Sequence, residues 1–94
     1  MKAVLAFHDK QVLPNGAILE MKIWQVATPV LGSAHNLKYS LFYGLSDRRL
    51  AGYDNEHGKG DHGHIEDRQE RYAFRTVERL IADFLADVRG LRGK

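Results

Sequence analysis

Apolar and polar side chains alternate along two segments of this chain, and the alternation restricts the folds open to it. Between residues 37 and 45 every second residue is apolar: Leu37, Tyr39, Leu41, Tyr43 and Leu45. Residues 17–23 alternate in the same way. Because successive side chains of a strand point to opposite faces, each segment predicts a strand with one buried face. Such strands form antiparallel sheets whose apolar face needs a covering layer.

Turn-forming residues separate these strands from their neighbours. The Pro-Asn-Gly sequence at 14–16 predicts a hairpin turn, preceded by a first strand with Ala3, Leu5 and Phe7 on one side. Breaks at 28–29 and 32–33 end the second strand. A polar turn at 46–49 is expected before a fourth strand at 50–54, and the polar residues 55–67 are expected to form a loop.

The last part of the chain has a helical period. Apolar residues spaced by three or four positions predict an amphipathic helix from about Thr76 to Arg89: Val77, Leu80, Ile81, Phe84, Leu85, Val88 and Leu91. Thr76 is a suitable N-cap, and Arg89 and Gly90 suit the other end. Tyr72 and Phe74 fit a short edge strand before it. The predicted fold is α+β, a four- or five-stranded antiparallel sheet with this helix packed on one face.

Composition excludes several classes of protein. The chain has 94 residues, enough for one small domain with a single core, and 44% hydrophobic residues argue against disorder. It contains no cysteine, so disulfides, thiolate metal sites and cysteine nucleophiles are excluded. The net charge of +2 does not suit nucleic-acid binding through bulk charge, although a local basic face fits it. The first apolar run is too short for a membrane span or signal peptide, so we expect a cytoplasmic protein.

The segment 52–64 concentrates groups that suit catalysis. It contains Tyr53, His57, Lys59, Asp61, His62 and His64, with three glycines between positions 58 and 63. An imidazole can take up and return a proton near neutral pH, and a nearby cation stabilises a developing anion. The segment therefore predicts cleavage of an RNA phosphodiester without a metal or other cofactor. The histidines would act as acid and base and Lys59 would contact the phosphate, while Tyr53 and Asp61 would orient these groups.

Other interpretations stay open at this stage. The segment also fits an inert surface loop, or a metal site in which His57, Asp54 or Asp61 joins His62 and His64. Arg48, Arg49 and Arg68 are candidates for substrate binding, but the arginines near position 70 alternate with acids, which is typical of a salt-bridged surface. Aromatic side chains could stack on bases or pack in the core: Trp24, Tyr39, Phe42 and Tyr43. No role is predicted for His8 or His35.

Several motifs resemble the TumE family of bacterial toxins. They are the runs Gly-Ser-Ala-His at 32–35, Lys-Tyr-Ser-Leu at 38–41, the whole of 52–64, Tyr-Ala-Phe at 72–74 and Leu-Ile-Ala-Asp-Phe at 80–84. The resemblance covers almost the whole chain. It implies the growth-inhibiting toxin of a type II toxin–antitoxin pair, neutralised by an adjacent helix-turn-helix antitoxin. At position 63 the chain has Gly where the resemblance implies a larger, often basic residue.

The resulting hypothesis is a toxin that cleaves RNA, by analogy with other toxins of this size. The alternatives are a module that binds nucleic acid or protein without chemistry, a metal-dependent nuclease, and a toxin that has lost its activity. Exposed sheet edges in so small a domain also suit a homodimer or an antitoxin complex.

Overall fold

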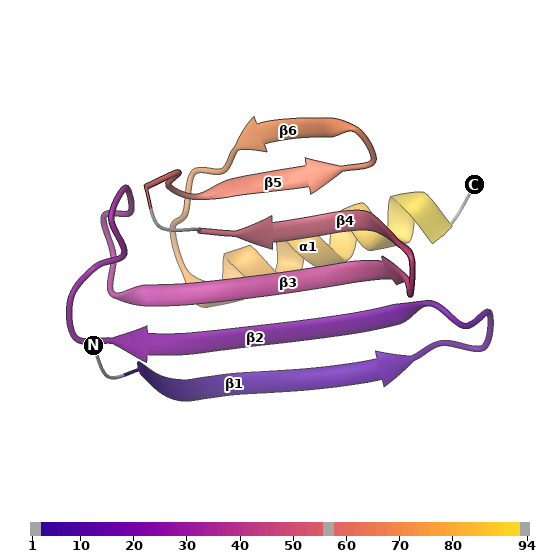
Figure 1. Ribbon diagram of the computed structural model, residues 1–94, viewed down its shortest axis with the longest axis horizontal. Coiled ribbons are helices and arrows are strands. Elements are labelled where there is room, and N and C mark those ends of the chain that lie inside the picture. The colour runs from indigo at the N-terminus through magenta and orange to yellow at the C-terminus, as the bar shows by residue number, and fades with distance from the viewer. Residues whose placement is uncertain (1–2, 56–57, 93–94) are drawn as a thin grey trace.

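The computed structural model describes residues 3–55 and 58–92. Six strands form one antiparallel sheet in which each strand pairs with the next along the chain (Figure 1). The strands are β1 (Ala3–Val12), β2 (Ile18–Val26), β3 (Leu37–Leu45), β4 (Arg48–Asp54), β5 (His62–Ile65) and β6 (Arg68–Arg71), and one helix, α1 (Val77–Arg92), follows them. The α+β class, the antiparallel sheet and the C-terminal helix agree with the prediction.

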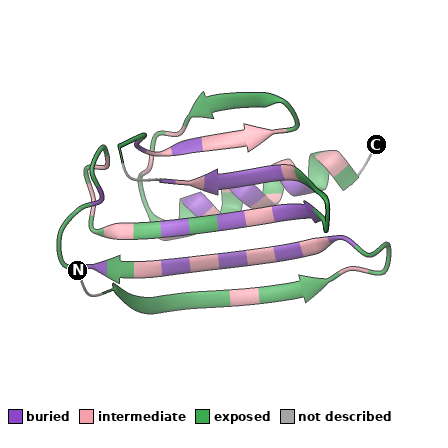
Figure 2. Cartoon of the chain, in the orientation of Figure 1, coloured by how far each residue is buried: buried purple, intermediate pink, exposed green. Residues whose placement is uncertain are grey.

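Alternation along β2 and β3 determines which face of the sheet is buried. Leu19, Met21 and Ile23 of β2 are buried, as are Tyr39 and Leu41 of β3, while the residues between them are more exposed (Figure 2). These side chains form one apolar cluster together with residues of α1. The predicted inward positions of both strands are therefore confirmed, apart from Leu45, which is exposed where β3 ends.

The helix α1 lies behind the sheet, across β3 and β4 (Figure 1). Leu80, Phe84 and Val88 are one turn apart and bury their side chains in the apolar cluster. Thr76 caps the helix, since its Oγ1 accepts a hydrogen bond from the Arg79 backbone N–H at 3.1 Å. The helix continues to Arg92 rather than ending at Arg89, because Gly90 does not take the positive φ that would terminate it.

The predicted number of strands is wrong. Residues 62–65 and 68–71 form a hairpin beside β4, where we expected mostly a loop. Tyr72 and Phe74, expected in an edge strand, follow β6 and pack against the core. The hairpin escaped prediction because one of its faces carries histidines and charged side chains, so the apolar alternation is absent. β4 also begins earlier than expected, at Arg48, so only Ser46 and Asp47 form the turn.

Strand β1 differs from the other long strands because it is exposed along its length except for Asp9 (Figure 2). A β-bulge between Leu5 and Phe7 places Leu5 opposite Trp24 and Phe7 opposite Ile23. The expectation that Leu5 and Phe7 share one side is therefore wrong, since the bulge shifts the alternation by one residue. No helix within the described residues is long and apolar enough to span a membrane.

Candidate functional site

Asp54, His62 and His64 form a cluster on the face of the sheet that α1 does not cover, and we call them the open-face cluster. Asp54 lies directly opposite His62 in the pairing of β4 with β5, so the two side chains share a face. His64, two residues along an extended strand, points the same way. The His62 Nε2 and Asp54 Oδ1 atoms are 2.8 Å apart, and the two imidazole ring centres are 5.0 Å apart.

Both ring nitrogens of His62 face acceptor atoms. Nδ1 is 2.9 Å from the Gly60 carbonyl oxygen, and Nε2 is turned to Asp54 Oδ1. A neutral imidazole has one N–H and can donate to only one of these acceptors. The Asp54 Oδ1 atom is buried, and no donor among the described residues forms a hydrogen bond of good geometry with it. Asp54 Oδ1 therefore remains available to a hydrogen-bond donor or to a bound cation.

His64 differs from His62 in exposure and charge. It is partly exposed, whereas His62 is 4% exposed. Burial lowers the pKa of His64, and the positive charges of Arg49 and His62 lower it further. A lowered pKa favours the neutral ring, whose nitrogen lone pair can accept a proton or bind a metal ion. His64 is the member of the open-face cluster best suited to act as a base.

Arg49 supplies a cation beside the cluster. Its side chain lies against Gly52, because a Cβ atom added at Gly52 would come within 2.8 Å of Arg49 Cδ. Its guanidinium Nη1 is 3.9 Å from Asp54 Oδ2. Gly52 is also paired with both Phe42 and His64. Because Gly52 has no side chain, the Arg49 side chain can lie over Gly52, next to the open-face cluster.

A second polar group, which we call the Asp61 network, consists of Ser33, His35, Tyr39 and Asp61. Ser33 Oγ donates to Asp61 Oδ1 at 2.6 Å, and Tyr39 Oη donates to Oδ2 at 2.7 Å. His35 Nε2 lies 2.6 Å from the same Oδ2 atom. Burial alone would raise the pKa of Asp61, but the bonds from Ser33, His35 and Tyr39 outweigh it and lower the pKa.

Two loops meet closely to build this network. Gly32 and Gly60 both have positive φ, and a Cβ atom on Gly32 would stand 2.8 Å from the Gly60 nitrogen. Asn55, which is 1% exposed, binds the same region, since it accepts from the Tyr39 N–H at 2.9 Å and donates to the Leu37 carbonyl at 2.7 Å. The glycine contact thus holds Gly60 against Gly32, and Asn55 joins the end of β4 to β3.

Replacing Asp61 with asparagine should destabilise the fold by about 1–3 kcal/mol at neutral pH, because three donors would then face an amide with one acceptor oxygen. The lowered pKa means that the ionised Asp61 stabilises the fold above its ordinary pKa. This contribution is lost as the pH falls through the lowered value. Urea denaturation of parent and D61N over a pH series measures it. A stability difference that stays constant down to the acid limit would contradict this role.

The structure brings some of the predicted site residues together and separates others. His62 and His64 converge, with Arg49 beside them, and His57 lies outside the described residues. Lys59 is exposed in the glycine-rich loop, and its charge reaches His64. Asp61 is engaged in its own network rather than directed at these histidines.

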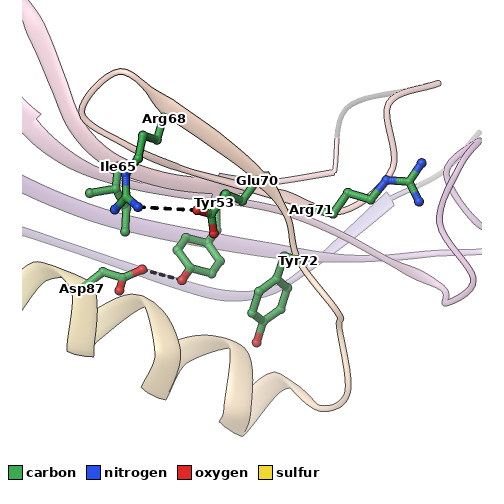
Figure 3. A pocket seen from close by; sticks show the side chains of 8 residues that line it. Tyr53, Ile65, Arg68, Glu70, Arg71, Tyr72 and Asp87 are labelled. Carbon is green, nitrogen blue, oxygen red and sulfur yellow. Dashed lines mark hydrogen bonds and ion pairs between the residues drawn. The ribbon is translucent and has the colours of Figure 1, made fainter.

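Tyr53 lies on the opposite face of the sheet from the open-face cluster. Its ring meets Phe84, and its hydroxyl donates to Asp87 of α1 (Figure 3). Burial raises the pKa of Tyr53, and the bond to Asp87 raises it further. In the β5–β6 hairpin, Arg68 Nη1 is 3.5 Å from Glu70 Oε1 (Figure 3). Arg48 is exposed at the start of β4. The structure therefore does not bring Tyr53, Arg48 or Arg68 to the histidines.

His35 has a defined place that sequence reasoning missed. Besides contacting Asp61, its ring stacks on Phe74 with the centres 3.9 Å apart. Together with Lys59 and Arg71 it lines a surface hollow of about 410 Å³ at this end of the sheet. The signal was present only in the resemblance, whose motifs include both His35 and Phe74.

Comparison with known proteins identifies one family. A search of curated proteins and a search of solved structures gave no match. The family model described as Toxin TumE matches residues 5–92, which run from within β1 to the end of α1 and include both polar groups described above. This chain therefore belongs to the Toxin TumE family.

Proposed function

We propose that this chain is the toxin of a type II toxin–antitoxin pair and that it inhibits growth by cleaving RNA at the open-face cluster. Membership of a toxin family supports the first part of this proposal. One observation carries the second. The partly exposed imidazole of His64, whose pKa is lowered, lies beside the guanidinium of Arg49 and against the buried His62 ring that contacts Asp54. Cleavage of an RNA phosphodiester requires a base that accepts the proton of the attacking hydroxyl and a cation that stabilises the charge on the phosphoryl group.

The reaction needs one proton to be moved twice. His64 takes the proton from a ribose 2′-hydroxyl, and the 2′ oxygen attacks the adjacent phosphorus. The bond from phosphorus to the 5′ oxygen then breaks, and the protonated His64 returns the proton to that oxygen. Arg49 stabilises the additional negative charge that develops on the phosphoryl oxygens. The products are a 2′,3′-cyclic phosphate and a 5′-hydroxyl.

His62 has a positioning role in this proposal. With 6% of its side chain exposed and both nitrogens turned to protein acceptors, it is poorly placed to reach a substrate. Its ring lies against His64 and its Nε2 against Asp54. His62 thus orients the base and keeps Asp54 turned inward.

The same cluster supports a second candidate, a metal-dependent nuclease. One ligand atom each of Asp54, His62 and His64 lies within 4.8 Å of the others. Zn²⁺ accepts nitrogen and carboxylate ligands at about 2.0–2.2 Å, and metal-binding histidines usually donate their other N–H to a carbonyl or carboxylate. The contact of His62 Nδ1 with the Gly60 carbonyl fits that pattern, as does the buried Asp54 Oδ1. A bound cation would leave one position open for water.

Incubation of end-labelled RNA with the purified protein and excess chelator separates these functions. We expect cleavage to continue in chelator, because His64 and Arg49 supply the chemistry. Cleavage that stops in chelator and returns with Zn²⁺ would replace this mechanism by the metal-dependent one. No cleavage in either condition, from a protein that still inhibits growth, would favour a toxin that binds without chemistry.

For the partner, we propose a helix-turn-helix antitoxin that neutralises the toxin. Membership of a toxin family supports an antitoxin in general. The outer edge of β1 suits such a contact, because Val4, Leu5 and Val12 are exposed beside unpaired backbone groups. A second copy of the chain is the other partner that this edge suits. The mass of the purified toxin in solution, alone and with the adjacent gene product, distinguishes the two.

A further inference from the structure

The residues of the helix-free face form rows that cross the sheet. Strand pairing places Lys22, Ser40, Asp54, His62 and Arg71 directly opposite one another from β2 to β6. A neighbouring row consists of Glu20, Phe42, Gly52, His64 and Gln69. Side chains directly opposite in paired strands share a face. The open-face cluster therefore belongs to a continuous surface, turned toward the viewer in Figure 1.

Two aromatic side chains lie on this face and not in the core. Trp24 pairs with Lys38, and Phe42 pairs with Gly52, next to Arg49. Both rings are only partly buried, whereas Tyr39 and Tyr43 are at most 3% exposed in the core. Nζ of Lys38 stands 5.8 Å from the Trp24 ring centre. Accessible aromatic rings on a sheet, flanked by cations, provide the surface on which unpaired bases stack.

The charges of this face favour a polyanion. Among the described residues that β2 to β6 direct to it, the cations are Lys22, Lys38, Arg49 and Arg71, and the acids are Glu20 and Asp54. Glu20 is already engaged by His8 at 2.9 Å and Lys22 at 3.7 Å. This face is therefore locally basic, although the whole chain carries a net charge of only +2.

We propose that single-stranded RNA binds across the helix-free face, with bases stacked on Trp24 and Phe42 and phosphates held by Lys22 and Lys38. This proposal rests on the proposed function and names its substrate class and path. β2 and β5 are three strand spacings apart, about 14 Å. An RNA strand stacked on Trp24 thus reaches His64 within a few nucleotides. Duplex RNA is excluded as the preferred ligand because its bases cannot expose their faces to the rings.

Fluorescence anisotropy with a short labelled RNA tests the proposal, with the H64A variant used throughout so that the RNA stays intact. Adding W24A or F42A should weaken binding about 5- to 150-fold. Adding K22A and K38A together should make the negative slope of log affinity against log salt shallower by about 1.4. Trp24→Phe, which keeps a ring, should restore most of the affinity lost in W24A, and the melting temperature of each variant shows that it folds.

The matched controls lie on other surfaces of the molecule. R89A and R92A together remove two charges from the exposed side of α1, and F7A removes an exposed aromatic ring from β1. Each, combined with H64A, should bind RNA as tightly as H64A alone. The proposal is overturned if W24A and F42A bind as tightly as the controls, if duplex RNA binds as well as single-stranded RNA, or if the substitutions weaken only antitoxin binding. RNA binding with this pattern but no cleavage by the parent would support the surface and contradict the proposed function alone.

Discussion

His64→Ala should lower the rate of RNA cleavage by about 10²- to 10⁴-fold, the usual contribution of a general base. His64 is the accessible imidazole of the open-face cluster, and its removal leaves Arg49 without a proton acceptor beside it. Rates on labelled RNA and growth on expression measure the effect. The control is R89A and R92A together, which removes two exposed side chains from α1 on the other side of the sheet and should leave the rate unchanged. Equal rates for H64A and the parent, both folded, would remove His64 from the mechanism.

The pH profile of the parent should report the same group. The base must be neutral, and burial together with Arg49 and His62 lowers the pKa of His64 below its ordinary value of about 6.5. Cleavage should therefore be constant at neutral pH and fall only as the pH drops through the lowered value. R49A removes one cause of the shift, so its acid limb should move toward higher pH. An unchanged acid limb in R49A would contradict this electrostatic coupling.

Phe84→Ala should destabilise the fold by about 3–5 kcal/mol, because it leaves a large cavity between α1 and the sheet. The Phe84 side chain is 0% exposed and contacts Tyr53, and it belongs to the apolar cluster between α1 and the sheet. Small domains have total stabilities of roughly 5–15 kcal/mol, so much of the protein would unfold in mild urea. The urea midpoint measures the loss, provided that the slope of the transition is unchanged.

Phe7→Ala is the matched control for Phe84→Ala. Phe7 is 39% exposed on β1, outside the apolar cluster, so the same chemical change should cost much less. Similar urea midpoints for F7A and F84A would contradict a stabilising contact between Phe84 and the sheet.

Much of the fold could be predicted because its signals are local. The buried faces of β2 and β3 follow from alternation, and α1 follows from its apolar stripe and the cap at Thr76. The β5–β6 hairpin could not be found in this way. His62, His64 and Gln69 of this hairpin lie on a face that is not part of the core, so the hairpin lacks apolar alternation. The bulge near Leu5 likewise leaves no mark in the sequence.

Part of the candidate site could likewise be predicted from local sequence, and part of it could not. His62 and His64 are two residues apart, and an extended chain brings such neighbours to one face, so the sequence suffices to join them. Arg49 and Asp54 join them only through the pairing of β4 and the missing side chain at Gly52. His35 reaches Asp61 across 26 residues through a contact of two glycine loops. No spacing rule predicts that contact, because it depends on tertiary packing.

The chemical form of the RNA ends produced in chelator tests the central claim most directly. Attack by the 2′ oxygen, with His64 moving the proton, predicts fragments that end in a 2′,3′-cyclic phosphate and begin with a 5′-hydroxyl. Mass spectrometry of the fragments distinguishes these ends from a 3′-hydroxyl and a 5′-phosphate. Fragments of the second kind would mean that water, and not the ribose, attacks the phosphorus, and would contradict the mechanism.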